Sequence, residues 1–205
     1  WAALYKAIYN ANDFMEILEQ RMKTFNETDK QLAYIYLAEA KVIRGMCYFE
    51  LVRRYGNVPL MATTAMSEQA PGTVVQEKPE VIYQFIEKDL ISASQTLPYA
   101  SDDNERTNTK FRMSKGAALG LLTKVYATWA GYPVNDTSKW EEAAKTAKTL
   151  VESRKHGLLN DFEQLWMNTC NGVWDSTESL IEISFYSPTA SGGAGDPCGR
   201  IGKWN

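Results

Sequence analysis

The residues of this sequence best suited to recognising a ligand are aromatic side chains that lie outside the predicted helices. Trp174, Tyr186 and Trp204 fall in predicted loops or at the end of a predicted strand. A flat aromatic ring in such a place can stack on the face of a sugar ring, while neighbouring Asp175 or Asn171 hydrogen-bonds the sugar hydroxyls. These five residues are candidate binding residues, and packing within the protein is the alternative interpretation for each aromatic ring.

The sequence lacks the motifs of common enzymes and cofactor-binding proteins. It has no GxxxxGK[ST] loop, no dinucleotide-binding glycine pattern, no HExxH, no GxSxG and no paired CxxC. With His156 as the single histidine, most proton-transfer reactions would depend on carboxylates. The adjacent pairs Glu141–Glu142 and Asp102–Asp103 are typical of solvated faces and give no sign of a glycosidase pair. The sequence therefore predicts no catalytic residue, no metal site and no cofactor.

The three cysteines, Cys47, Cys170 and Cys198, do not have the spacing of a metal site. Cys47 fits a buried position in a helix. Cys170 and Cys198 lie in segments predicted to be irregular, so they could form a disulfide in an oxidising compartment. The sequence leaves this pairing open.

Composition and charge restrict the class of protein. The 205 residues are 44% hydrophobic, which suffices for a substantial core in one domain or in a piece of a larger one. A net charge of -3 without a basic face does not support nucleic-acid binding. No apolar run approaches the roughly 18 residues of a membrane helix. Because the sequence begins at Trp1 inside a helical pattern, without a signal peptide, we expect a fragment of a longer protein.

The best-defined element is a long helix within residues 31–60. Gly56 can adopt the left-handed conformation that ends a helix, and Pro59 cannot continue one. Apolar side chains occur on all sides of this helix, so we expect it to lie between other helices. Glu39 and Arg44 are five residues apart and point in different directions, so we expect each to find its partner on a different neighbour.

A shorter helix precedes the long one and is predicted to pair with it as an antiparallel hairpin. It starts at Trp1 and ends before a polar turn at residues 26–30. Asn12 lies on its apolar face. We interpret Asn12 as a hydrogen-bonded core residue that fixes the helix register, with a ligand contact as the alternative.

Three further helices follow a surface connection at residues 61–78. Pro79 suits the first position of one helix, and Ser114 is the expected N-cap of the next. The third covers residues 138–153. Trp129 and Trp140, both in these helices, are predicted to lie in the core.

The sequence also contains a loose repeat. The helices that end at Gly56 and Gly131 are both followed by a proline, which predicts that they end in the same way. Their separation of about two tetratricopeptide repeat (TPR) periods predicts a mainly α fold of TPR-like antiparallel hairpins forming an α-α superhelix. We expect a helical scaffold at residues 1–157. Residues 158–205 are expected to form an irregular segment with a short strand at 180–185, the start of the ligand-facing part.

The run AEAKVIRGMCYFELVRRYGNVPL, residues 38–60, resembles the signature of the SusD/RagB family, in which AEA, an arginine, an aromatic pair and YGxVPL recur. The segments VIYQFIEKDLISASQTLP, SKGAALGLLTKVYATWAG and ESLIEISF are similar to later family segments, in family order. The chain departs from the family at Phe111-Arg112, where Gly-Arg is common. The resemblance covers nearly the whole chain.

This resemblance implies a non-catalytic, lipid-anchored protein on the extracellular face of a Gram-negative outer membrane. Members bind glycans, or in some cases peptides, and cap a SusC-like TonB-dependent transporter. The resemblance implies that the lipid anchor and much of the ligand surface lie outside this chain, and it supplies no binding residue at a matched position. Two alternatives remain: a TPR-like protein–protein interaction adaptor without glycan binding, and a helical glycosidase.

Overall fold

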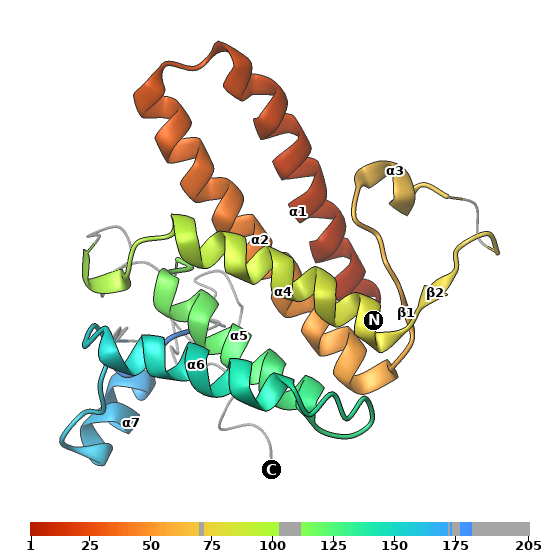
Figure 1. The fold of residues 1–205 in the computed structure, drawn as a ribbon. Helices are drawn as coiled ribbons and strands as arrows, with labels where there is room; N and C mark the ends of the chain where they lie inside the picture. The colour runs from red at the N-terminus through yellow and green to blue at the C-terminus, as the bar shows by residue number, and fades with distance from the viewer. Residues whose placement is uncertain (70–71, 103–111, 172, 174–176, 182–205) are drawn as a thin grey trace, which may run out of the picture.

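The computed structural model describes residues 1–69, 72–102, 112–171, 173 and 177–181. Helices dominate this part of the chain, and they are arranged as successive antiparallel hairpins (Figure 1). In chain order the elements are α1 (Ala2–Arg21), η1 (Met22–Thr24), α2 (Glu27–Tyr55), β1 (Val58–Pro59), α3 (Thr64–Ser67), β2 (Gln76–Glu77), α4 (Pro79–Thr96), η2 (Ala100–Asp102), α5 (Lys115–Ala130), α6 (Lys139–Glu152) and α7 (Phe162–Cys170). The mainly α, TPR-like architecture predicted from the sequence is confirmed. No helix of the described residues is both long and apolar enough to cross a membrane.

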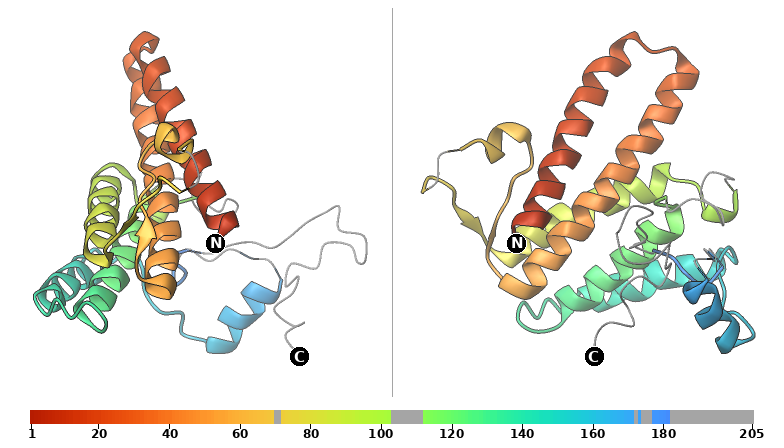
Figure 2. Two further views of the ribbon diagram at one scale, coloured as in Figure 1. Left: turned by 90° about the vertical axis from the view of Figure 1, so that its right-hand side faces the viewer. Right: turned by 180° about the vertical axis from the view of Figure 1, so that it is seen from behind.

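Helices α1 and α2 form the predicted antiparallel hairpin, whose closed end projects away from the other helices in all three views (Figures 1 and 2). The turn between them is shorter than predicted. Asn26 caps α2 because its side-chain oxygen accepts a hydrogen bond from the backbone N–H of Asp29 at 2.9 Å. Residues 27–30, predicted as a polar turn, are therefore the first turn of the helix.

Helix α2 packs against α1, α4 and α5, which confirms the prediction made from its apolar surface. Its residue Gly45 allows close approach to α4, because a Cβ at this position would lie 3.3 Å from the Leu90 side chain. Cys47 is buried as expected, and burial raises the pKa of its thiol to about 11. The helix ends at Gly56, whose φ of 68° is in the region that favours glycine.

The connection between α2 and α4 contains more structure than the predicted surface loop. Strands β1 and β2 pair antiparallel, with Val58 opposite Glu77 and Pro59 opposite Gln76. Between them lies the single-turn helix α3, capped by the Thr63 side chain. This two-stranded ribbon lies beside the start of α1 (Figures 1 and 2).

Helices α4, α5 and α6 continue the superhelix. Pro79 is at the first turn of α4 and Ser114 caps α5, both as predicted. Helix α5 packs between α4 and α6, and its Trp129 stacks on Tyr83 of α4 with ring centroids 5.4 Å apart. Trp129 is 3% exposed, which confirms its place in the core. The two predicted glycine endings differ, however, because Gly131 has an extended backbone with φ of -91°.

Two predictions about the later helices are wrong. Trp140 is 53% exposed, because α6 has α5 on one side and, of its own residues, buries only Ala143. Cys170 is the last residue of helix α7, in a region predicted to be irregular. Leu180 and Ile181 are not in a strand, and the rest of the predicted strand, like Cys198, lies outside the described residues.

The chain after α6 lies against α5 at two glycines. A Cβ on Gly116 would meet the His156 ring at 2.0 Å, and a Cβ on Gly120 would meet the Leu180 side chain at 2.5 Å. These glycines, one helical turn apart, leave the space that the two side chains occupy. The segment is also held by the backbone hydrogen bond from Gly157 N–H to the Thr177 carbonyl at 3.0 Å.

Candidate functional site

A buried polar cluster joins α1, α2 and α4. The guanidinium of Arg44 donates to both carboxylate oxygens of Asp89, at 2.8 and 2.9 Å, and to the side-chain oxygen of Asn12 at 2.7 Å. Its planar group also lies over the Phe85 ring, 4.7 Å from the centroid. Asn12 is 1% exposed, so it is the hydrogen-bonded core residue that its position in the sequence suggested. The two-fold contact with Asp89 uses the fork geometry that distinguishes arginine from lysine.

This cluster also holds the backbone of residues 59–64, here called the anchored segment. Asn12 donates to the Met61 carbonyl at 2.9 Å, and Arg44 donates to the Ala62 carbonyl at 3.2 Å. Buried side chains on two different helices therefore bond to consecutive carbonyls of one connection. Because a buried carbonyl without a partner is unfavourable, these bonds fix the path of the segment over the hairpin.

Two tyrosines add to this attachment. The hydroxyl of Tyr48 accepts from the Met61 N–H at 2.7 Å and is 3.1 Å from the Met61 carbonyl, to which it donates. The hydroxyl of Tyr5 donates to the Pro59 carbonyl at 2.8 Å. Burial raises the pKa of Tyr48 to about 12 and also raises the pKa of Tyr5, so both hydroxyls keep their protons at neutral pH.

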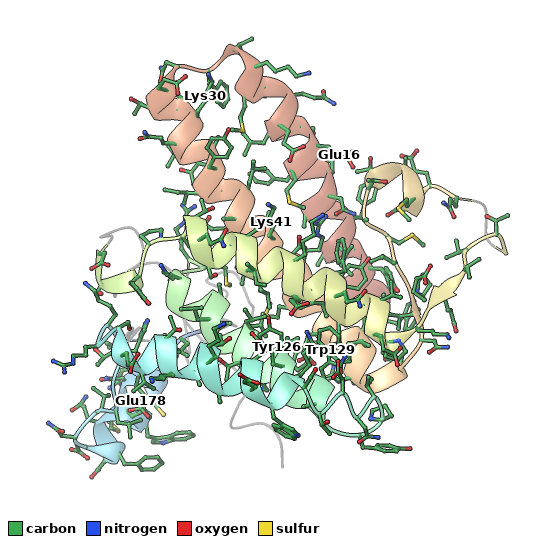
Figure 3. All side chains as sticks on the ribbon, in the orientation of Figure 1. Glu16, Lys30, Lys41, Tyr126, Trp129 and Glu178 are labelled. Atoms are coloured by element: carbon green, nitrogen blue, oxygen red, sulfur yellow. The ribbon has the colours of Figure 1, made fainter. Side chains whose placement is uncertain are left out.

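The last attachment comes from Glu16 on α1. Its carboxylate accepts from the Thr64 N–H at 2.9 Å and from the Thr64 hydroxyl at 2.6 Å. Figure 3 shows Glu16 on the side of α1 that faces α3. The hydrogen bonds from Thr64 lower the pKa of Glu16, because they favour the charged carboxylate. Helix α1 thus fixes the start of α3 through a charged acceptor.

Next to the anchored segment lies a cavity of about 400 Å³, here called the aromatic pocket. It lies between the first turns of α1 and the connection from α2 to α4, and it is lined by Trp1, Tyr5, Tyr9, Pro59, Met61, Ser67 and Val74. Its volume is within the range of small-molecule sites, about 300–1,000 Å³. None of these seven described residues has a charged side chain.

The tryptophan of this pocket is held by two tyrosines. Its ring centroid is 5.1 Å from that of Tyr5, with a tilt of 43°, and 4.9 Å from that of Tyr55, in an edge arrangement at 79°. These distances are typical of favourable aromatic pairs. Trp1 is nevertheless 48% exposed and Tyr9 is 36% exposed, so the rest of this chain does not cover either ring.

A second cavity, of about 560 Å³, lies between α1 and α2 on another part of the hairpin, and we call it the hairpin groove. It is lined by Ala7, Asn10, Ala11, Phe14, Tyr36, Glu39, Ala40, Ile43 and Arg112. Arg112 forms an ion pair with Glu39, donating from Nε at 2.9 Å, and lies over the Tyr36 ring at 4.8 Å. Glu39 and Arg44 thus have partners on different neighbours, as the sequence predicted.

Of the five residues proposed from the sequence as a binding site, Asn171 is the one that the structure describes. Trp174, Asp175, Tyr186 and Trp204 lie outside the described residues. Asn171 is described and exposed, directly after α7, where its backbone N–H donates to the Met167 carbonyl at 2.9 Å.

Sequence reasoning missed the aromatic pocket because it assigned the first helix to scaffold. The signal was present in the spacing of Trp1, Tyr5 and Tyr9, which recur every four residues and share one side of a helix. The same spacing equally fits a buried stripe. The structure places these rings next to Tyr55 and the anchored segment, which are distant in sequence. They line a cavity there and do not form a fully buried stripe.

Comparison with known proteins identifies the relatives of the chain. Residues 1–127 match the SusD-like family described as starch-binding and associating with the outer membrane. A SusD-like protein of Bacteroides ovatus is 27% identical over 189 residues, which cover 90% of this chain and 32% of that protein.

Solved structures agree with this match. The structure of a SusD homolog from Bacteroides thetaiotaomicron is 66% identical with a TM-score of 0.93, and the match covers 100% of this chain and 38% of that one. A laminarin-binding SusD-like protein is 26% identical with a TM-score of 0.70, covering 94% of this chain and 38% of the other. The chain thus spans about a third of the length of these relatives. The motif around the long helix, the hairpin architecture and these matches agree, and the chain belongs to the SusD-like family.

Proposed function

We propose that the protein carrying this chain binds a glycan at the outer membrane and passes it unchanged to a TonB-dependent transporter. The observation that carries this proposal is membership of a family described as starch-binding and associating with the outer membrane. The relative described as laminarin-binding has the same helical architecture over nearly all of this chain. A SusC-like transporter as partner, a lipid anchor and a position on the extracellular face are parts of the same proposal.

The engagement of the carboxylates supports binding rather than hydrolysis. Asp89 is paired with Arg44, Glu39 with Arg112, and Glu16 accepts two hydrogen bonds from Thr64. A glycosidase needs one carboxyl group that can donate a proton and a second that faces the sugar. These three carboxylates instead hold parts of the scaffold together, and in keeping with this we propose that the protein is not an enzyme.

The sequence-based candidates remain part of the proposal. Aromatic rings and polar groups after α7 would add sugar contacts to a surface completed by the rest of the protein. These candidates are Asn171, Trp174, Asp175, Tyr186 and Trp204.

Electrophoresis of the full-length protein in native gels containing single polysaccharides tests this function. We expect retardation in at least one gel from a panel of laminarin, starch, xyloglucan and polygalacturonate, relative to a protein without glycan affinity. Incubation with the same polysaccharide should release no reducing ends. Unchanged mobility in every gel, or release of reducing ends that is lost with one carboxylate substitution, would contradict the proposal.

The hairpin groove favours a second candidate function, an adaptor that binds proteins only. The groove is mostly apolar and carries the partly exposed side chains Phe14 and Ile43, features that protein–protein contacts share. Under this alternative the full-length protein would co-purify with a barrel transporter and ignore every polysaccharide of the panel.

A further inference from the structure

We propose that the aromatic pocket is a subsite for an uncharged sugar ring of the glycan, contacted by Trp1 and Tyr9. This inference rests on the proposed glycan-binding function and adds to it a location and a ligand charge. Neither the family resemblance nor the sequence-based candidates point to this pocket.

The first step of the argument is the presentation of the rings. Trp1 is fixed between Tyr5 and Tyr55 at centroid distances of 5.1 and 4.9 Å, yet about half of its surface is exposed. An aromatic ring that its neighbours already orient loses little conformational freedom when a ligand binds. Tyr9, about two helical turns after Trp1, lies on the same side of α1 and also lines the cavity.

The second step is the rigidity of the opposite wall. Pro59 and Met61 line the pocket and belong to the anchored segment, whose backbone accepts hydrogen bonds from Tyr5, Asn12 and Tyr48. A wall held by buried hydrogen bonds keeps its position with or without a ligand. The pocket is therefore formed before binding, which lowers the entropic cost of association.

The third step concerns charge. Among the described residues, the lining of the pocket contains no Lys, Arg, Asp or Glu. A uronic acid or a sulfated sugar would lose hydration of its charge there without gaining an oppositely charged partner. A neutral sugar has apolar C–H faces for the rings, and its hydroxyls can hydrogen-bond to the hydroxyls of Tyr9 and Ser67. The lining thus favours neutral over acidic sugars.

The hairpin groove does not offer the same chemistry. Its ring of Tyr36 is already covered by the Arg112 guanidinium, and the Glu39–Arg112 pair lies at its edge. Phe14 is then the aromatic side chain of the groove left to stack on a sugar. Of the two cavities, the aromatic pocket is the one suited to a sugar ring.

The test measures the affinity of the full-length protein for laminarin, starch, xyloglucan and polygalacturonate by calorimetry and affinity gels. We expect binding to a neutral polysaccharide. We expect Trp1→Ala to weaken it by about 10-fold and Tyr9→Ala by about 3-fold, the losses that correspond to one aromatic contact each. Tyr9→Phe keeps the ring and should retain most of the affinity.

Tyr34→Ala is the matched control. Tyr34 is an exposed tyrosine on the same hairpin, near the opposite end of α2, and its removal should leave affinity unchanged. Circular dichroism melting checks that each variant is folded; if Trp1→Ala does not fold, Tyr9→Ala, which leaves the contacts of Trp1 with Tyr5 and Tyr55 in place, decides the outcome.

The outcomes separate the inference from the proposed function. Wild-type binding that Trp1→Ala and Tyr9→Ala leave unchanged would overturn the pocket as a subsite while glycan binding stands. Binding to polygalacturonate alone would overturn the inference that the sugar is uncharged, while glycan binding stands. A wild-type protein that binds no polysaccharide of the panel would overturn the proposed function, and the inference with it.

Discussion

The hairpin α1–α2 and the hairpin α5–α6 are stabilised by different kinds of interaction. In the first, buried polar side chains make directional bonds: Arg44 joins Asp89 and Asn12, and the same groups hold the anchored segment. These groups are almost inaccessible to water, so each bond has a large effect if its partner is removed.

In the second hairpin, one lysine joins the helices by contacts with aromatic rings and with a carboxylate. The Lys139 ammonium lies 4.0 Å from the Trp129 ring centroid and 3.0 Å from a Glu87 carboxylate oxygen, to which Tyr126 also donates at 2.8 Å. Figure 3 shows Tyr126 and Trp129 on α5 where it passes α6. Burial, followed by the contact with Glu87, raises the pKa of Tyr126.

The kind of interaction in each region corresponds to what that region positions, a connection in the first and a neighbouring helix in the second. Hydrogen bonds from buried side chains fix the path of a connection, and here they occur where a connection forms the wall of a pocket. Around the second hairpin, the cation–π contact and the bonds to Glu87 occur where helices stack on one another, and these groups are more exposed than Arg44 and Asp89. We therefore expect substitutions to affect the first region more than the second.

The largest effect should come from Asp89→Ala. It leaves the Arg44 guanidinium buried without its carboxylate, which typically costs about 3–5 kcal/mol of unfolding free energy. Urea denaturation of the full-length protein measures this loss. The double variant Arg44→Met with Asp89→Leu removes both charges and should lose much less. An equal loss in both would show that packing rather than the unpaired charge is responsible.

A smaller effect is expected from Gly116→Ala on α5. The new methyl group would meet the His156 ring at 2.0 Å, so the His156 side chain or the segment that carries it must move. Overpacking costs about 1–3 kcal/mol, partly offset by the higher helix propensity of alanine, about 1 kcal/mol. We expect a net loss of up to about 2 kcal/mol in thermal or urea unfolding. Gly157→Ala, where the new methyl group meets nothing within 4 Å, is the control and should be neutral.

Lys139→Met should have an effect of about 1 kcal/mol. It removes the charge over Trp129 and the bond to Glu87, but the methionine can keep contact with the ring. Chemical denaturation compares it with Lys145→Met, the same change at an exposed lysine of α6 that should shift stability by less than about 0.5 kcal/mol. A loss as large as that of Asp89→Ala would remove the proposed contrast between the two hairpins.

The smallest effect is a local pH dependence at Glu16. Hydrogen bonds from Thr64 lower its folded-state pKa, so this interaction is fully present above the unfolded-state value, about 4.3, and is lost as the pH falls through the folded-state pKa. In NMR titrations the Thr64 amide shift should follow a transition below about pH 4.3. Glu16→Gln should abolish that transition, and a midpoint at or above 4.3 in the wild type would contradict the assignment.

The sequence by itself determined where α2 ends and where α4 and α5 begin. Gly56 ends α2 because of its backbone freedom, Pro79 starts α4, and Ser114 caps α5; these are local effects of single residues. The apolar surface of α2 predicted its central place, and a polar residue on an apolar stripe identified Asn12. Spacing alone also predicted that Glu39 and Arg44 would have different partners.

Tertiary structure decided which distant residues meet. The crossing of the helices decides that Arg44 pairs with Asp89 and that Trp140 faces solvent. It also decides which residues line one cavity, among them Trp1, Tyr9 and Pro59. Helical periodicity places a side chain on one side of its helix, but it does not say whether another helix, a loop or water covers that side. The aromatic pocket arises because buried hydrogen bonds fix a connection against the start of α1, and no local pattern encodes that contact.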